Sequence, residues 1–294
     1  MEQEDNPILL TNLRQRIEAT TELPSMPETA QALLRLGADP NGNINNLVEI
    51  VENDPSLAAQ VMRYARSAIF SFPGEIHSLH QAITSVLGYQ FTIDVCLGIS
   101  LGKTFAIPTH GSMGLYPFWQ HSVYSATLIE RLIQIMPAQH RPHPGLGFLS
   151  GLLHNFGVLL VAHLFKQENT LLQQIIAANP DIPRTILERQ VLGTDHMEIG
   201  AWLMRKWNLQ PEIQVAVAEH HDEFYRGVHA TYARLVLLTD RLLKQHNIGD
   251  AESEVLPEFT LSSLGLSQEQ AETALMHVMS SSEDINILAR QLAA

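Results

Sequence analysis

Side chains of the types that bind divalent metals recur through the second half of this 294-residue chain. They are His121, the pair His154 and Asn155, His196, the pair His220 and His221, and Asp240. Neutral imidazole and carboxylate groups suit zinc, iron, nickel and manganese, which can activate water and stabilise developing charge in hydrolytic reactions. The sequence therefore offers a candidate metal centre, provided that the fold brings these side chains together.

The pair of adjacent histidines restricts how that centre can be built. Neighbouring residues on a helix face different ways, so His220 and His221 can point into one site only near a helix end. Asp222 and Glu223 follow at once, which is consistent with a helix that finishes there. We therefore expect both histidines at the C-terminal end of the helix that starts at Pro211.

Asp240 lies in the strongly apolar segment TYARLVLLTDRLL, which predicts a buried helix. An unpaired carboxylate is costly to bury, so Asp240 needs a partner. The neighbouring Arg241 faces elsewhere on a helix. We expect His121 or His154 to pair with Asp240, with or without a metal.

The elements that must position these residues are all predicted to be helices, since no period-two pattern extends over a useful length. In the segment SMPETAQALLRLG, Pro27 is expected just inside a helix start and Gly37 just past its end. Ser267 and Gln270 resemble a capping box. The longest apolar stretch, FLSGLLHNFGVLLVAHLF, is interrupted by Asn155, a glycine and two histidines, and is expected to form buried core helices rather than a membrane span.

A stretch rich in glycine and proline, IPTHGSMGLYP, suggests a connection between subdomains. The expected organisation is an N-terminal helical subdomain over residues 1–110, a helical core over residues 111–250, and a helical tail over residues 251–294. The candidate ligands all fall in the core.

Charge and cysteine content exclude several classes of function. The net charge is −13, from 18 Lys and Arg against 31 Asp and Glu, so we expect no nucleic-acid partner and no membrane surface as partner. Cys96 is the only cysteine, which rules out a disulfide within one chain and favours a reducing compartment. The acidic start MEQEDNPILL lacks the basic region of a secretory signal, so a cytoplasmic protein is expected. The chain has no phosphate-binding Gly-x-x-x-x-Gly-Lys loop.

Several short motifs together resemble the HDOD domain, the HD-related output domain of bacterial signalling proteins. The resemblance covers about residues 20 to 245, and the combination of motifs is specific although no single motif is. The matching segments are Leu23-Pro24-Ser25-Met26-Pro27, Asp54-Pro55-Ser56-Leu57, Ala65-Arg66-Ser67-Ala68, Trp119-Gln120-His121-Ser122, and Leu152-Leu153-His154-Asn155-Phe156-Gly157. Arg66 departs from the pattern, which usually has asparagine there, and could pair with a carboxylate or a phosphate or simply be solvated.

The resemblance implies an all-α fold, an HD-domain-like helical bundle with an N-terminal helical subdomain. It also implies where metal ligands would lie in catalytic relatives. His121 would be the first ligand, His154 the histidine of a His-Asp pair, and Asp240 the last ligand. The later histidine positions would be His196, His220 and His221.

Asn155 departs from this ligand pattern, because it stands where the aspartate of the pair would be. Aspartate carries a full charge and can bridge two metals, whereas asparagine offers one neutral oxygen and two donor hydrogens. Two neighbouring metals need bridging anions to offset their repulsion. We therefore interpret the site as a remnant, with no cofactor expected or, alternatively, one divalent metal such as Fe, Mn, Ni or Zn.

Three functions remain open on this interpretation. The leading hypothesis is a non-catalytic HDOD signalling module that acts through contacts with signalling proteins, such as two-component or second-messenger components. The alternatives are a metal-dependent phosphohydrolase acting on a nucleotide or cyclic dinucleotide, and a ligand-sensing module without turnover. The sequence gives no indication of oligomeric state.

Overall fold

The computed structural model describes residues 16, 23–67, 70, 72–105 and 115–293. Within these ranges the chain is built from helices and contains no strand, which confirms the predicted all-α fold. The expected connection between subdomains lies mostly outside the described residues, since residues 106–114 are not among them.

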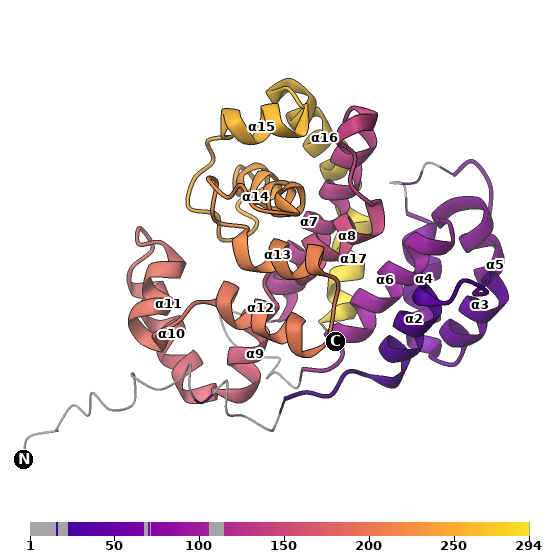
Figure 1. The fold of residues 1–294 in the computed structure, drawn as a ribbon, viewed down its shortest axis with the longest axis horizontal. Coiled ribbons are helices and arrows are strands. Elements are labelled where there is room, and N and C mark those ends of the chain that lie inside the picture. The colour runs from indigo at the N-terminus through magenta and orange to yellow at the C-terminus, as the bar shows by residue number, and fades with distance from the viewer. Residues whose placement is uncertain (1–15, 17–22, 68–69, 71, 106–114, 294) are drawn as a thin grey trace, which may run out of the picture.

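The N-terminal helices pack together at one side of the molecule (Figure 1). They are α2 (Glu28–Ala38), α3 (Ile44–Glu52), α4 (Pro55–Ala65), α5 (Leu79–Ala82), the π-helical turn η3 (Ile83–Leu87) and α6 (Tyr89–Gly102). Asp54 caps α4 by accepting a hydrogen bond from the Leu57 amide at 3.0 Å, and Pro55 is the first residue of that helix.

The predicted ends of α2 were wrong by one residue at the start and by two residues at the end. Pro27 precedes the helix as its N-cap, and Gly37 lies inside the last turn. A β-carbon on Gly37 would lie 3.6 Å from Ile93 on α6, so this glycine is at the packing contact between α2 and α6 and is not a helix stop.

The central helix of the larger region is α7 (Leu115–Ile135), which packs against α8 (Pro144–Leu153), α14 (Ala230–Lys244) and the two C-terminal helices (Figure 1). Gly151 allows a close approach of α8, because a β-carbon there would lie 2.7 Å from the backbone of Ala126 on α7. In the same way Gly157 on α9 (Phe156–Leu164) touches the backbone of α12 (His196–Lys206). Both contacts place the turn at residues 154–155 deep in the core.

The remaining helices surround this core. They are the short turn η4 (Ala138–His140), α10 (Lys166–Ala178), α11 (Arg184–Leu192), α13 (Pro211–Glu219), α15 (Glu258–Leu264), α16 (Gln268–Ser280) and α17 (Ser282–Leu292). The predicted capping box of Ser267 and Gln270 is present at the start of α16. The C-terminal helix α17 packs against both α7 and α4, so it joins the N-terminal helices to the core.

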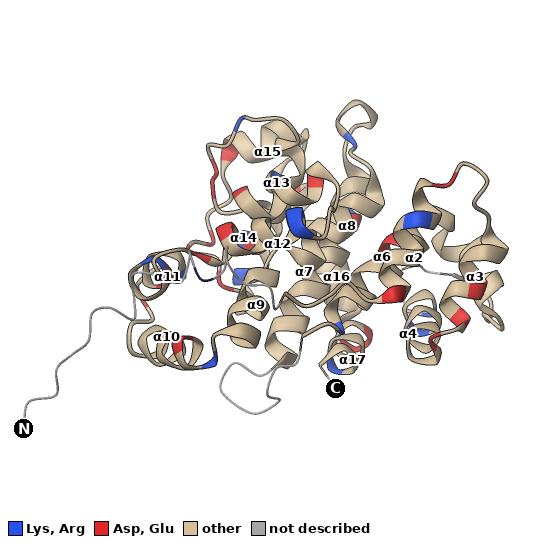
Figure 2. Cartoon of the chain, turned by 60° about the horizontal axis from the view of Figure 1, so that its bottom comes forward, with Lys and Arg blue, Asp and Glu red and all other residues tan. Residues whose placement is uncertain are grey.

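The longest apolar stretch forms α8 and α9. Residues 144–164 are long and apolar enough to cross a membrane, but 89% of the most apolar window is buried inside the protein. Acidic and basic residues are spread over the helices of both regions (Figure 2). The burial of residues 144–164 confirms the prediction that the apolar stretch forms core helices.

Candidate metal centre

All seven predicted site residues lie together in the core, although they come from five places in the chain. His121 is in the second turn of α7, and Asp240 is in the middle of α14. His154 and Asn155 form the turn between α8 and α9. His196 is the first residue of α12, and His220 and His221 follow directly after α13.

The first group of ligand atoms belongs to His121, His154 and Asp240, and these atoms lie within 4.8 Å of one another. The Oδ1 atom of Asp240 lies 3.0 Å from Nε2 of His121 and 3.8 Å from Nε2 of His154. Asp240 therefore has the histidine partners that its burial required.

The second group belongs to His196, His220 and His221, whose ligand atoms also lie within 4.8 Å of one another. Both members of the adjacent pair reach this group because α13 ends at Glu219 and the backbone leaves the helix there. The prediction that the pair lies at a helix end is confirmed. The rings of His154 and His220 are 5.0 Å apart at 76°, so the two groups are neighbours.

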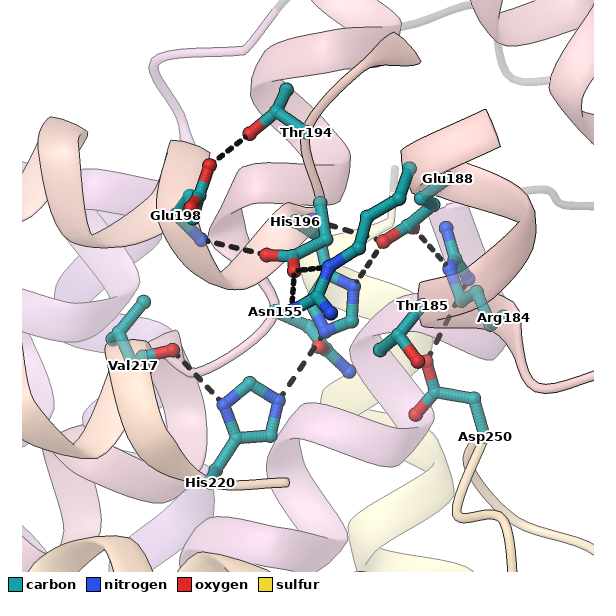
Figure 3. Close-up of polar contacts among 12 residues, drawn as sticks. Asn155, Arg184, Thr185, Glu188, Thr194, His196, Glu198, Val217, His220 and Asp250 are labelled. Atoms are coloured by element: carbon teal, nitrogen blue, oxygen red, sulfur yellow. Dashed lines mark hydrogen bonds and ion pairs between the residues drawn. The ribbon is translucent and has the colours of Figure 1, made fainter. Parts of the chain in front are cut away.

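Backbone carbonyls fix the orientation of two of these rings. Nδ1 of His154 is 2.7 Å from the carbonyl oxygen of Gly151. Figure 3 shows the corresponding contact of His220, whose Nδ1 atom is 3.0 Å from the carbonyl oxygen of Val217. A carbonyl oxygen can only accept, so both Nδ1 atoms carry the hydrogen and donate it. In the neutral rings Nε2 is then a bare lone pair, which is the arrangement of a metal-ligating histidine.

Glu188 on α11 fixes the orientation of the His196 ring. Its Oε2 atom is 2.6 Å from Nδ1 of His196 and accepts the backbone amide of the same residue at 2.9 Å. Nε2 of His196 then faces Nε2 of His220 at 3.3 Å. Two lone pairs that face each other at this distance repel, so a proton or a metal ion must lie between them.

Charges around the rings set how the metal-free site is protonated. Burial lowers the pKa of His154 to about 4, and the nearby carboxylates only partly offset this. Burial, with the neighbouring histidines, also holds the pKa of His220 well below its usual range. Burial opposes a charge on His196 too, but Glu188 outweighs it and raises the pKa of His196. Without a metal, the shared proton therefore belongs to His196, which donates it to His220.

Asn155 contacts the first ligand directly. Its Nδ2 atom lies 3.3 Å from Nδ1 of His121, while its Oδ1 atom is buried without a hydrogen-bond partner in the part of the chain that the structure describes. With the amide as donor, Nε2 of His121 carries the hydrogen and donates it to Asp240. Burial disfavours the charged ring of His121, but this hydrogen bond and the Asp240 charge outweigh burial and raise the pKa of His121.

These residues fit a divalent metal. Nε2 of His154 and Oδ2 of Asp240 are buried and lack a hydrogen-bond partner among the described residues, which is costly unless a cation satisfies them. Several imidazole nitrogens and one carboxylate suit Fe, Mn, Ni or Zn. The first group and the second group would supply the ligands, and the Nδ1 contacts already orient the rings of His154, His196 and His220.

Three further residues belong to the site but were missed by the sequence analysis. Arg184 donates from Nε to Glu188 at 2.7 Å, and its Nη1 atom lies 3.8 Å from Asp250 (Figure 3). Against burial, the charges of His196 and Arg184 lower the pKa of Glu188 to about 2. The four-residue spacing of Arg184 and Glu188 was a signal for a helical ion pair. Nothing in the sequence signalled Asp250, which follows the last predicted ligand helix.

Among the described residues, Arg66 makes no ion pair with a carboxylate and does not contact the candidate metal centre. Its guanidinium donates to the backbone carbonyl of Ile76 at 3.2 and 2.6 Å, and the residue is exposed. It therefore ties the end of α4 to the segment before α5.

Comparisons with known proteins agree on one family. The model of the HDOD domain matches residues 23–223. A crystal structure of a protein from Marinobacter aquaeolei VT8, provisionally named a signal transduction protein, is 32% identical with a TM-score of 0.80, covering 96% of this chain and 61% of that one. The crystal structure of an HDOD domain protein with unknown function from Geobacter sulfurreducens is 23% identical, with a TM-score of 0.73. The match covers 97% of this chain and 98% of that one.

A curated relative adds length information. An uncharacterized protein from Treponema pallidum (strain Nichols) is 22% identical over 269 residues, which cover 89% of this chain and 49% of that protein. The chain thus spans about half the length of this relative and 61% of the Marinobacter protein.

Proposed function

This chain belongs to the HDOD family, and we propose that it is a non-catalytic signal-transduction module that acts through contacts with other signalling proteins. The observation that carries the proposal is the burial of most of the ligand site. His154 and His220 are 0% exposed, and Asp240 is 1% exposed. A phosphoester must reach the metal to be hydrolysed, and five of the six candidate ligands are buried, with His221 partly exposed.

The departure at Asn155 supports the same conclusion. Its amide is directed at His121, so it contributes no anion between the two groups of ligands. Two metals at the spacing of a hydrolytic pair would receive no bridging anion from this position. A buried histidine cluster that orders the core without turnover is consistent with a regulatory module.

Exposed apolar side chains support a role in protein contacts. Phe224 and Val228 are 72% and 74% exposed in the turn after α13, and Val255 is 73% exposed before α15. The guanidinium of Arg226 lies 3.5 Å above the ring of Phe259, which brings the two segments together. Clustered apolar groups on a surface commonly mark interaction sites. We propose that a component of a two-component or second-messenger pathway binds here, in the cytoplasm.

The proposal is tested with purified, untagged protein. It is stripped with a chelator, reloaded with Mn, Fe, Ni or Zn, and assayed against bis-p-nitrophenyl phosphate and cyclic dinucleotides. We expect no turnover above that of an Asp240→Asn variant. Metal-dependent turnover that disappears in this variant would overturn the proposal.

The second candidate function is a metal-dependent phosphohydrolase, and one observation favours it. Two complete groups of ligand atoms survive side by side, with the rings of His154 and His220 in contact. A metal bound there would supply an activated water and stabilise charge on a phosphoryl oxygen. The same assay decides between the two functions.

A further inference from the structure

The loop that follows α14 returns the chain onto the metal site. Gly249 has a positive φ of +89° and lies against the ring of His121, where a β-carbon would be 2.6 Å from Nε2. Only glycine fits both the backbone conformation and the contact. This close approach delivers the next residue, Asp250, to the edge of the histidine cluster.

The Asp250 carboxylate is buried without the hydrogen bonds that a buried anion requires. Its side chain is 18% exposed, yet both oxygens are buried and have no hydrogen-bond partner in the part of the chain that the structure describes. Nη1 of Arg184 lies 3.8 Å away, beyond hydrogen-bond distance, and donation from Nε of Arg184 goes to Glu188. A carboxylate in this state is costly unless another cation satisfies it.

The Asp250 charge interacts with histidines of both groups of ligands. Burial opposes the ionised form of Asp250, but Arg184, His121, His221 and His196 outweigh it and hold its pKa well below the usual range. His121 belongs to the first group, whereas the other two histidines belong to the second. Asp250 is thus a buried carboxylate at the edge of the site, outside the two sets of ligand atoms that already lie within 4.8 Å of one another.

We propose that Asp250 is a carboxylate ligand of the divalent metal centre, supplying the anion that Asn155 cannot. The centre then has two aspartates, Asp240 from α14 and Asp250 from the loop after it, together with the histidines. A set of histidine nitrogens and carboxylate oxygens suits Zn, Fe or Mn. The inference concerns metal binding alone and holds whether or not the chain turns over a substrate.

The first test is metal affinity with a matched control. Asp250→Asn and Glu254→Gln each remove one negative charge from the same loop, but Glu254 is exposed. We expect Asp250→Asn to weaken binding of Zn²⁺ to the chelator-stripped protein by about 10- to 100-fold, as loss of groups at metal sites does. Glu254→Gln should bind as the wild type does. Equal affinities of the two variants, or a wild type that binds no Zn²⁺, would overturn the proposal.

The second test reports ligation directly. A cysteine thiolate bound to Co²⁺ gives a sulfur-to-metal charge-transfer band, whereas a carboxylate does not. We expect this band when Co²⁺ is added to the Asp250→Cys variant. It should be absent from Glu254→Cys and from the wild type, whose Cys96 is buried in α6. An Asp250→Cys protein that binds Co²⁺ as tightly as the wild type without the band would refute ligation by residue 250. Neither test measures turnover, so a result against ligation by Asp250 is distinct from a result against the proposed function.

Discussion

Substitution of Glu188 by glutamine tests whether the second group of histidines is held by a buried charge. Glu188 is 1% exposed and accepts three hydrogen bonds, from the amide and the ring of His196 and from Arg184. Glutamine has the same shape but carries no charge, and its NH₂ group would face one of the donors. The variant therefore removes the anion while leaving the packing intact.

The magnitude follows from the pKa of this carboxyl. Burial raises it, but His196 and Arg184 lower it to about 2 from the ordinary value of 4.5. A shift of about 2.5 units is worth about 3 kcal/mol of folding free energy. Because the pKa is lowered in the folded state, this stability is present above about pH 4.5 and is lost as the pH falls through about 2. Removing one partner of a buried ion pair costs about 3–5 kcal/mol, which agrees with the value obtained from the pKa shift.

Urea denaturation of the metal-free protein, followed by circular dichroism, measures the effect. We expect Glu188→Gln to lower the free energy of unfolding by about 3 kcal/mol at neutral pH. The control is Glu212→Gln, because Glu212 pairs with His229 at 3.5 Å with both side chains partly exposed. Such a pair is worth about 0–1 kcal/mol. A loss for Glu188→Gln that is no larger than that of the control would refute the reasoning.

Three other variants probe separate parts of the fold. Asn155→Asp adds a carboxylate beside the first ligand, so we expect zinc to bind about tenfold more tightly, which is about 1.4 kcal/mol of additional zinc-induced stability in thermal unfolding; an unchanged shift would contradict this. Burial raises the pKa of Glu130 to about 7, so folded protein binds its proton more tightly and loses up to about 3 kcal/mol as the pH rises from about 4.5 to 7. Urea titrations at both pH values should show that this loss of stability is smaller in Glu130→Gln but unchanged in the exposed control Glu49→Gln. If the free energy of unfolding of both variants falls equally between the two pH values, Glu130 is not the source of the loss. Gly157→Ala places a methyl group against the backbone of α12 and should cost about 2–3 kcal/mol in the same assay, whereas a neutral effect would mean that the helices separate freely.

The sequence predicted the site best where local geometry constrains a residue. Adjacent histidines cannot share a helix face, which correctly placed His220 and His221 at a helix end. The cost of burying Asp240 correctly predicted a histidine partner. Both arguments need only one segment and a general rule, so no knowledge of the tertiary fold was required.

The missed residues depend on contacts between distant segments. Glu188 joins the site because α11 lies beside the start of α12, and Asp250 joins because a left-handed glycine directs the loop onto α7. Neither contact leaves a periodic or motif signal. The wrong end of α2 has the same origin, since Gly37 is explained by its contact with α6 and not by helix termination.

The contact between His196 and His220 connects protonation to metal binding. Their Nε2 atoms are 3.3 Å apart, and both Nδ1 atoms already donate to fixed acceptors. The space between them holds either the proton of His196 or a metal, so metal binding must release that proton. Glu188 raises the pKa of His196 against burial, so the competition extends above the ordinary histidine range. We expect zinc affinity to rise about tenfold per pH unit below that pKa, as measured by competition with a chromophoric chelator whose own pH dependence is known. An affinity independent of pH over this range would show that the metal does not replace the shared proton.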